Sequence, residues 1–175
     1  MPVLYTPRLT CSPVQEEDWP FFLSLQQHPD VMRFVAEARP EEAIREAFTA
    51  RLPAWTPGSD HWLCLVVRDN LSQMPLGVTG YIHHDDDCAE VGFLFAPQAQ
   101  GKGYGFESLQ AVCDYAFGQG GIRRLTATVT AGNVASKRLL EKVGFVLEGE
   151  LRESYWLAGQ WHNDWLFGLL KHEYR

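Results

Sequence analysis

Residues 93–117 read FLFAPQAQGKGYGFESLQAVCDYAF, and this stretch decides how the chain folds. An apolar run reaches Pro97, and a short loop follows it. The loop has glycine at alternate positions, namely Gly101, Gly103 and Gly105. From Phe106 to Phe117, apolar residues recur at helical spacing. The stretch therefore predicts a strand, a glycine loop and a helix in succession.

The glycine loop is suited to hold a phosphate group. Glycines let consecutive backbone N–H groups turn inward, and the start of a helix adds unpaired N–H groups and the positive end of its dipole. A Walker loop is excluded because Gly103 follows Lys102, and the dinucleotide pattern fails because Phe106 replaces its third glycine. What remains is the pattern Gln100-x-x-Gly103-x-Gly105. A tight glycine turn without a ligand is the alternative at this point.

Composition predicts one folded domain over residues 1–175. A chain of 175 residues, 46% hydrophobic and 13% aromatic, is long enough to bury roughly two-thirds of its unfolded surface. No apolar run approaches the roughly 20 residues that span a bilayer, and the opening MPVLYTPRL lacks the basic and apolar parts of a signal peptide. The four cysteines are widely spaced, which favours neither a zinc site nor a disulfide framework. We therefore expect a cytoplasmic protein without a membrane partner.

The net charge of −7 limits the class of partner. Nonspecific nucleic-acid binding needs a basic surface, so we expect no nucleic-acid partner. The charge is compatible with a cationic acceptor such as an amine, although solubility alone also explains it.

Hydrophobic periodicity and turn residues predict the order of the remaining elements. The expected strands cover residues 4–13 (an edge strand), 61–67, 76–83 and 125–129, and from residue 145 onward two strands turn at 157–159. The expected helices begin near residues 16, 40 and 133, with a short turn or helix at 30–34. The order indicates an α/β (α+β) domain with a mixed sheet.

A second informative stretch, residues 131–156, reads AGNVASKRLLEKVGFVLEGELRESYW. Asn133 stands where a helix N-cap is expected, and Gly144 where a left-handed C-cap is expected. Phe145 is then placed to fold back on Leu140. These caps close a helix well in any protein, so by themselves they carry no functional meaning.

The wording N-x-x-S-x-x-L-L-E-K-x-G-F-x-x-E-G in this stretch is more specific. It resembles the RimJ/RimL-type branch of the GNAT superfamily, the ribosomal-protein N-terminal acetyltransferases and their relatives. Residues 6–9 (TPRL), residues 100–105 and the late Trp161-x-x-Asp164 agree with it. The branch usually continues its opening into Leu-Arg-Pro, whereas this chain has Cys11-Ser12-Pro13, a departure that bears on acceptor recognition. Residues 15–55 match only loosely.

The resemblance implies a single GNAT-type domain with a mixed, mostly antiparallel central sheet flanked by helices. It also implies acetyl-CoA as co-substrate, with no metal. The loop residues that would hold the CoA diphosphate are Gln100, Gly101, Lys102, Gly103, Tyr104 and Gly105. The backbone of Phe93, Leu94 and Phe95 would pair with pantetheine, and a backbone N–H at a bulged end of this strand would polarise the thioester carbonyl. Asn133 matches a pantetheine-binding position, and Lys137 lies close enough to meet a CoA phosphate.

The resemblance implies direct transfer without an acyl-enzyme, and the chain has no nucleophile motif such as G-x-S-x-G. Ser136 matches the position that in close relatives protonates the departing thiolate. Glu90 is the candidate base, directly or through water, because strand alternation puts it on the face opposite Val91. An exposed hairpin carboxylate is the alternative for Glu90. His83 and His84 are further candidates, of which at most one faces the site.

Two more groups of polar residues have alternative interpretations. His83, His84 and the three aspartates that follow could bind a metal, but a solvated hairpin tip explains them better. Glu150 and Asp164 would either fix the acceptor ammonium or bridge neighbouring strands.

The acceptor that the resemblance favours is the N-terminal α-amine of a protein or peptide. An α-amine has a pKa near 8 and lysine one near 10.4, so a modest base suffices for the α-amine. Tryptophans at positions 19, 55, 62, 156, 161 and 165 could line a peptide groove, although some must belong to the core. The alternatives are a small-amine acetyltransferase acting on a polyamine, an aminoglycoside or an amino acid, a non-catalytic CoA-binding module, and a structural or regulatory protein on the same scaffold. The chain is expected to be a monomer or a homodimer.

Overall fold

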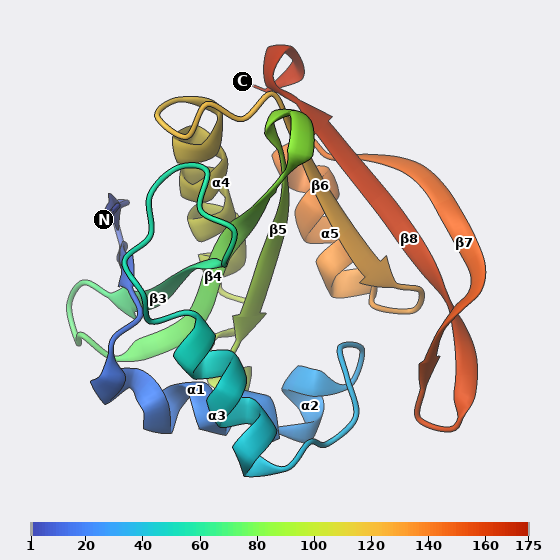
Figure 1. Ribbon diagram of the computed structural model, residues 1–175, viewed down its shortest axis with the longest axis horizontal. Coiled ribbons are helices and arrows are strands. Elements are labelled where there is room, and N and C mark those ends of the chain that lie inside the picture. The colour runs from blue at the N-terminus through green and yellow to red at the C-terminus, as the bar shows by residue number, and fades with distance from the viewer. Residues whose placement is uncertain (1, 175) are drawn as a thin grey trace.

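The computed structural model describes residues 2–174, so Met1 and Arg175 of the expected 1–175 domain lie outside the described part. Its framework is one sheet in the strand order β1-β2-β3-β4-β5-β6-β8-β7 (Figure 1). The strands are β1 (Leu4–Tyr5), β2 (Leu9–Pro13), β3 (Leu63–Asp69), β4 (Pro75–His84), β5 (Cys88–Phe95), β6 (Arg124–Thr130), β7 (Val146–Leu157) and β8 (Gln160–Leu170). Only β5 and β6 pair in parallel, so the expectation of a mixed, mostly antiparallel sheet is confirmed.

The helices fall where the periodicity predicts them. The α-helices are α1 (Trp19–Gln27), α2 (Pro29–Met32), α3 (Glu41–Ala50), α4 (Tyr104–Phe117) and α5 (Val134–Val143). Short 3-10 turns are η1 (Glu16–Asp18), η2 (Asp85–Asp87), η3 (Pro97–Ala99) and η4 (Lys171–Glu173). None of the helices within residues 2–174 has the length and apolarity needed to cross a bilayer.

The single edge strand expected over residues 4–13 is two strands. Thr6 and Leu9 close a turn between them, because the Thr6 N–H donates to the Leu9 carbonyl at 2.9 Å and the Leu9 N–H donates to Thr6 Oγ1 at 3.0 Å. The chain therefore reverses, and β1 pairs antiparallel with β2. β2 continues into the sheet beside β3, so β1 is the edge strand of this pair and β2 is not.

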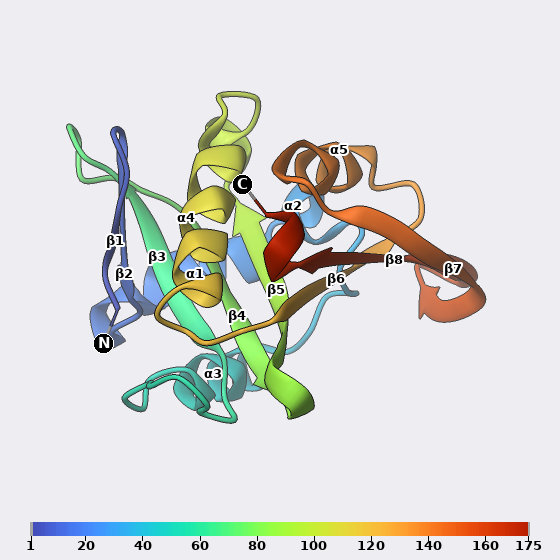
Figure 2. The same cartoon turned by 90° about the horizontal axis from the view of Figure 1, so that it is seen from above.

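Helices cover both faces of β3 and β4, which explains why β3 is apolar from Leu63 to Val67. Cys64, Val66 and Val78 pack with the α1 and α3 side chains of one core cluster. The alternate residues Leu63 and Leu65 belong to a second cluster that includes α4. Figure 2 shows α3 and α4 on either side of these strands. Burial on both faces requires a continuous apolar run rather than an alternating one.

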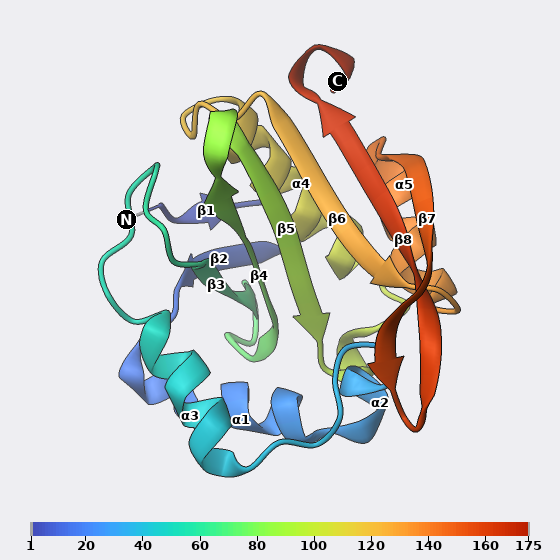
Figure 3. The same ribbon diagram turned by 45° about the vertical axis from the view of Figure 1, so that its right-hand side comes forward.

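β5 and β6 part from each other halfway along their length. Their pairing covers Cys88↔Arg124, Ala89↔Leu125 and Glu90↔Thr126 and then stops. Figure 3 shows the two strands diverging beyond this point. Over the rest of its length β5 pairs with β4 alone.

The bulge expected at the end of β5 is not found in the described residues. The register with β4 runs without a shift from Gly77↔Phe95 to His84↔Cys88. The free edge of β5 arises instead from its divergence from β6. Once β6 has moved away, the backbone of β5 is exposed on that side without a bulge.

The caps of α5 are as the sequence predicts. Asn133 Oδ1 accepts a hydrogen bond from the Ser136 N–H at 3.3 Å. At the other end Gly144 has φ 122°, and the Phe145 N–H donates to the Leu140 carbonyl at 3.0 Å. The expected turn at 157–159 between the last two strands is also confirmed.

The first test concerns the core between the sheet and the helices α1 and α3. Phe48 is 0% exposed and packs on Phe22 with ring centroids 5.2 Å apart. Phe48→Ala should lower the free energy of unfolding by about 3–5 kcal/mol because it leaves a cavity. Urea denaturation measures the change. Leu71→Ala, at a side chain 96% exposed, is the control and should stay within about 0.5 kcal/mol of the original protein; equal losses in the two variants would contradict this description of the core.

Candidate active site

The glycine loop joins the end of β5 to the start of α4. Gly101 has φ 75° and Gly103 has φ 82°, a left-handed conformation that glycine adopts without strain. The Gln100 side chain donates from Nε2 to the Phe95 carbonyl at 3.1 Å and fixes the loop to the strand. Within residues 2–174, the N–H groups of Gly103 and of the first two helical residues, Tyr104 and Gly105, donate no hydrogen bond. The loop therefore presents a row of free donors at a helix N-terminus, which suits an anion.

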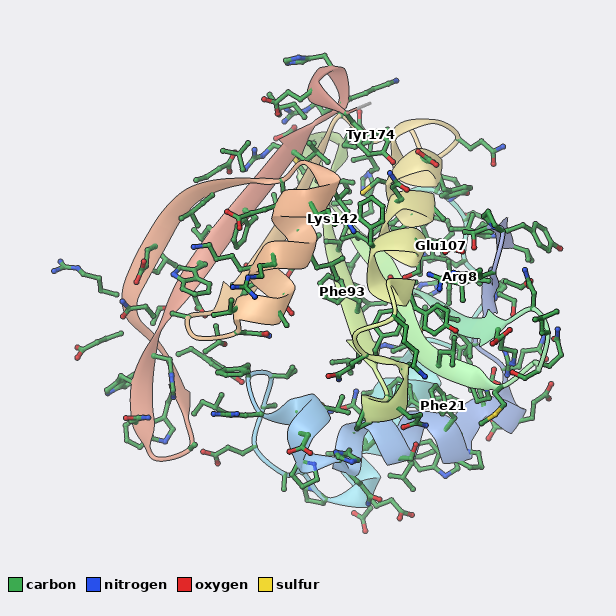
Figure 4. The ribbon with its side chains drawn as sticks, turned by 180° about the vertical axis from the view of Figure 1, so that it is seen from behind. Arg8, Phe21, Phe93, Glu107, Lys142 and Tyr174 are labelled. Carbon is green, nitrogen blue, oxygen red and sulfur yellow. The ribbon has the colours of Figure 1, made fainter. Side chains whose placement is uncertain are left out.

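The N-terminal segment braces this loop through Glu107 in the first turn of α4. Arg8 donates from Nε to Glu107 Oε1 at 2.8 Å and from its N–H to Oε2 at 3.0 Å, and the Thr6 hydroxyl also donates to Oε2. Arg8 Nη1 donates to the Lys102 carbonyl at 3.0 Å, and its guanidinium lies 4.5 Å from the Tyr104 ring centroid. Figure 4 shows Arg8 and Glu107 side by side.

Glu107 and Arg8 each stabilise the charged form of the other. Burial opposes ionisation of Glu107, but the hydrogen bonds from Thr6 and Arg8 outweigh it and lower the Glu107 pKa. The hydrogen bond to Glu107 is in turn the main cause of the raised Arg8 pKa. The sequence predicts residues 6–9 as part of an edge strand and of the family resemblance, but the local sequence holds no signal that links them to a helix about a hundred residues later.

A cavity of about 670 Å³, here called the loop-side cavity, opens between the glycine loop and α5. Figure 4 shows Phe93 between α4 and α5. The lining contains most residues expected to hold the co-substrate, namely Phe93, Leu94, Phe95, Gln100, Gly101, Gly103, Tyr104, Gly105 and Asn133. It also contains Ser136, the expected proton donor to the thiolate.

Two lysines expected at this site are not in the lining. Lys137 directs its Nζ to 4.9 Å from the Trp165 ring centroid on β8. Lys102 contributes its carbonyl to the brace with Arg8 rather than a side chain to the cavity. The cations that line the loop-side cavity are Arg33, Arg138 and Lys142. The one-residue step from Lys137 to Arg138 turns the side chain by about 100° around the helix, which explains the difference.

A second cavity of about 540 Å³, the helix-side cavity, lies between the sheet and the α1–α2 region. It shares six lining residues with the loop-side cavity, namely Phe34, Val35, Phe93, Leu94, Asn133 and Ser136. The two cavities therefore meet where β5 has lost its neighbour. The Ser136 hydroxyl stands at this junction and makes no hydrogen bond within the described residues.

Two of the three candidate bases, Glu90 and His84, are in contact with each other. Glu90 lines the helix-side cavity, and its Oε1 lies 3.4 Å from His84 Nε2. His83 points the other way, with Nε2 3.6 Å from Asp87 Oδ1. In an extended strand Glu90 lies about 10 Å along the chain from Phe93. The proton of an amine that reacts beside Phe93 would therefore reach Glu90 through water. No group of three or more His, Cys, Asp or Glu side chains in residues 2–174 is arranged to hold a metal ion.

Glu150 and Asp164 bridge β7 and β8. Glu150 accepts from Asn163 Nδ2 at 2.6 Å and from Trp165 Nε1 at 3.1 Å, and Asp164 accepts from the Ser154 hydroxyl at 2.7 Å. Of the two carboxylates, Asp164 alone also lines the helix-side cavity. Both alternatives raised for these residues therefore stay open for Asp164, whereas Glu150 is a strand bridge.

Of the six tryptophans, Trp62 alone lines the helix-side cavity. Trp55 is buried in the core and packs edge-on against Tyr81, with centroids 5.5 Å apart. Trp156 and Trp161 form an exposed pair on the β7–β8 hairpin. Of the tryptophans expected to line a peptide groove, one contributes to this cavity.

Tyr155 and Ala158 of the β7–β8 hairpin hold the segment between α2 and α3 against the helix-side cavity. The Tyr155 hydroxyl donates to the Val35 carbonyl at 2.6 Å, and the Ala158 N–H donates to Glu37 Oε1 at 2.9 Å. One wall of the cavity is therefore fixed by residues more than a hundred positions away.

The cavity contains a cysteine, but not a reactive one. Burial raises the pKa of the Cys64 thiol to about 11. At neutral pH almost no thiolate is present, and the thiolate is the nucleophilic form. Cys64 is therefore not a nucleophile at neutral pH.

Comparison with known proteins agrees with this geometry. The family model of the acetyltransferase (GNAT) domain matches residues 8–146. The N-acetyltransferase YnaD of Bacillus subtilis is 24% identical over 169 residues, 97% of each chain. The spermidine N(1)-acetyltransferase of Escherichia coli is 26% identical and covers 93% of this chain and 86% of its own length.

Among solved structures, RimL, a ribosomal alpha-N-protein acetyltransferase in complex with coenzyme A, superimposes with a TM-score of 0.83. It is 18% identical and covers 97% of this chain and 98% of its own, so it shows the shared fold. The family model matches most of the chain and therefore shows its family as well as its fold. The chain belongs to the GNAT family and is an acetyl-CoA-dependent N-acetyltransferase.

Proposed function

We propose that this acetyltransferase modifies the N-terminal α-amine of a protein or peptide. One observation supports the proposal above others: the loop-side and helix-side cavities meet at Phe93, Leu94, Asn133 and Ser136. A donor can enter this junction from one side and an acceptor from the other. Placing two reactants in contact supplies the largest part of the rate enhancement for such a transfer.

The loop-side cavity has the features that acetyl-CoA requires. The free N–H groups of the glycine loop would bind its diphosphate, and Arg138 and Lys142 would lie beside its phosphates. The unpaired edge of β5 at Phe93–Phe95 would pair with the pantetheine amides as an added strand. Asn133 is already a helix cap through Oδ1, so it would donate to pantetheine from Nδ2.

The proposed chemistry is a direct transfer. The neutral amine attacks the thioester carbonyl, whose oxygen takes up negative charge while a backbone N–H of β5 stabilises it. The amine proton leaves through water to Glu90 and on to the exposed His84. The intermediate then expels the thiolate, and the Ser136 hydroxyl gives it a proton.

The preference for an α-amine rests on its pKa. At neutral pH an appreciable fraction of an α-amine is neutral, whereas lysine and polyamine nitrogens are almost fully protonated. A partly exposed carboxylate such as Glu90 is a modest base, which suits the easier acceptor. The name of RimL is in keeping with such an acceptor.

A small amine is the second candidate acceptor. The spermidine N(1)-acetyltransferase relative favours it, as do Glu90 and Asp164, which give the helix-side cavity two carboxylates for a cation. The reading as a non-catalytic CoA-binding module is less well supported, because both candidate catalytic residues line the cavity where an acceptor would bind.

The brace on the glycine loop gives one test. Glu107→Gln removes the charge that holds Arg8 and should weaken acetyl-CoA binding roughly 10-fold, measured by calorimetry. Because the Glu107 pKa is lowered on folding, its stabilising contribution is complete above the unfolded pKa and is lost as pH falls through the folded pKa. The stability difference between original and variant should therefore be constant near neutral pH and shrink in acid. Glu46→Gln, on the exposed side of α3, is the control, and a Glu107→Gln variant with unchanged affinity would refute the brace.

Ser136 gives a second test. Ser136→Ala should lower turnover roughly 100-fold and leave acetyl-CoA affinity nearly unchanged, because the hydroxyl would act only as the thiolate leaves. Stopped-assay rates and calorimetry on the same sample separate the two effects. A loss confined to affinity would make Ser136 a binding residue instead.

The acceptor itself is tested with one peptide that carries a free N-terminus and an internal lysine. Mass spectrometry of the product should place the acetyl group on the α-amine. Acetylation of the lysine alone, or efficient acetylation of spermidine with the peptide unmodified, would contradict the proposed acceptor.

A further inference from the structure

Two arginines on the wall of the helix-side cavity have no acidic partner in the described part of the chain. Arg51 at the end of α3 and Arg39 in the segment before it both line this cavity. Within residues 2–174, neither guanidinium lies within salt-bridge distance of a carboxylate. Arg51 Nη1 donates to the Ala47 carbonyl at 2.7 Å, and Arg39 Nη2 donates to Gln26 Oε1 at 2.7 Å. Each therefore has only a neutral hydrogen-bond partner, and most of its donors stay available.

The Arg51 guanidinium is held in place by aromatic rings. It lies 5.7 Å from the Phe22 ring centroid and 5.9 Å from that of Trp62. The Trp62 ring in turn lies against β5, because a Cβ placed on Gly92 would be 3.1 Å from its Cζ3 atom. Gly92 is next to Phe93, where the two cavities meet. The Trp62 ring thus lies between the Arg51 guanidinium and the part of β5 where the two cavities meet.

The charge on this wall is unfavourable as it stands. Burial lowers the pKa of Arg51, and the nearby positive charge of Arg39 lowers it further, with only the Cys64 thiol opposing. A half-buried guanidinium without a counter-ion loses hydration, and the Ala47 carbonyl and the two aromatic rings replace only part of it. The other charged groups that face the cavity are the carboxylates Glu90 and Asp164. An anion brought in by a ligand would remove the imbalance at the arginines.

We propose that the acceptor carries a carboxylate close to the reacting amine, and that Arg51 and Arg39 bind this carboxylate. The proposal rests on the proposed function and narrows its substrate class to acidic peptide N-termini, with Asp or Glu among the first residues. Planar guanidinium groups bind carboxylates through paired hydrogen bonds, which gives both affinity and orientation. A polyamine, whose remaining ammonium groups would face the two arginines, is the acceptor that this wall disfavours.

The experiment compares matched peptides that differ only in one carboxylate. Three pairs carry Asp or Asn at position 1, 2 or 3 and are otherwise identical, with an amidated C-terminus. At one position, kcat/KM should be roughly 10- to 100-fold higher for the Asp peptide, the range of a charged hydrogen bond. Arg51→Met should reduce this ratio to near 1 by slowing only the Asp peptide, and Arg51→Lys should restore part of it.

A matched control lies on the same helix. Arg45 also stacks on aromatic rings, 5.0 Å from the Trp19 centroid and 5.2 Å from that of Phe48, but it is not part of the cavity lining. Arg45→Met should keep the Asp-to-Asn ratio of the original protein. Thermal denaturation of all variants separates a lost contact from lost folding.

Calorimetry of the same pairs on the CoA-bound protein gives a readout that needs no turnover. Equal affinities and equal kcat/KM in all three pairs would overturn the carboxylate proposal, and so would an undiminished preference in Arg51→Met. Acetylation of lysine or spermidine alone would instead overturn the proposed α-amine acceptor. The two failures are therefore distinguishable.

Discussion

The parting of β5 and β6 after the Glu90↔Thr126 pair is the constraint on which the rest of the structure depends. A strand that loses one neighbour exposes backbone N–H and C=O groups, and these need partners. Here the exposed edge faces two cavities, one bordered by the glycine loop and one by the α1–α2 region. In the proposed function, an extended ligand such as pantetheine completes the hydrogen bonding in this gap. The candidate site thus lies where the hydrogen bonding between β5 and β6 stops.

Rigid supports compensate for that opening on each side. On the loop side, Glu107 ties α4 to Arg8, whose guanidinium also holds the Lys102 carbonyl. On the other side, the Tyr155 hydroxyl anchors the segment between α2 and α3 at Val35. Both supports join residues about a hundred or more positions apart. They fix the walls of the two cavities, and the direct transfer proposed here depends on how well such walls align a donor with an acceptor.

Much of the fold could be predicted from the sequence because it depends on local chemistry. The glycines of the loop, the Asn133 cap and the Gly144 stop are requirements of the backbone within a few residues, so each is readable from its immediate neighbours. The apolar run of β3 likewise shows a strand buried on both faces. One misplaced feature came from an interaction outside that range, because the position of Lys137 depends on Trp165 of β8. The other is local, because the reversal between β1 and β2 depends on a turn closed by Thr6 and Leu9.

The sequence by itself determined the order of the elements, the glycine loop before α4 and the family resemblance, because these depend on periodicity and on short motifs. Only the tertiary structure decided that Glu90 and His84 touch, that Arg8 braces the loop, and that Arg39 and Arg51 share a cavity without a counter-ion. These relations join segments that meet only when the sheet assembles. Charge and hydrogen bonding act through space over a few ångströms, and the linear sequence does not record which side chains come within that distance.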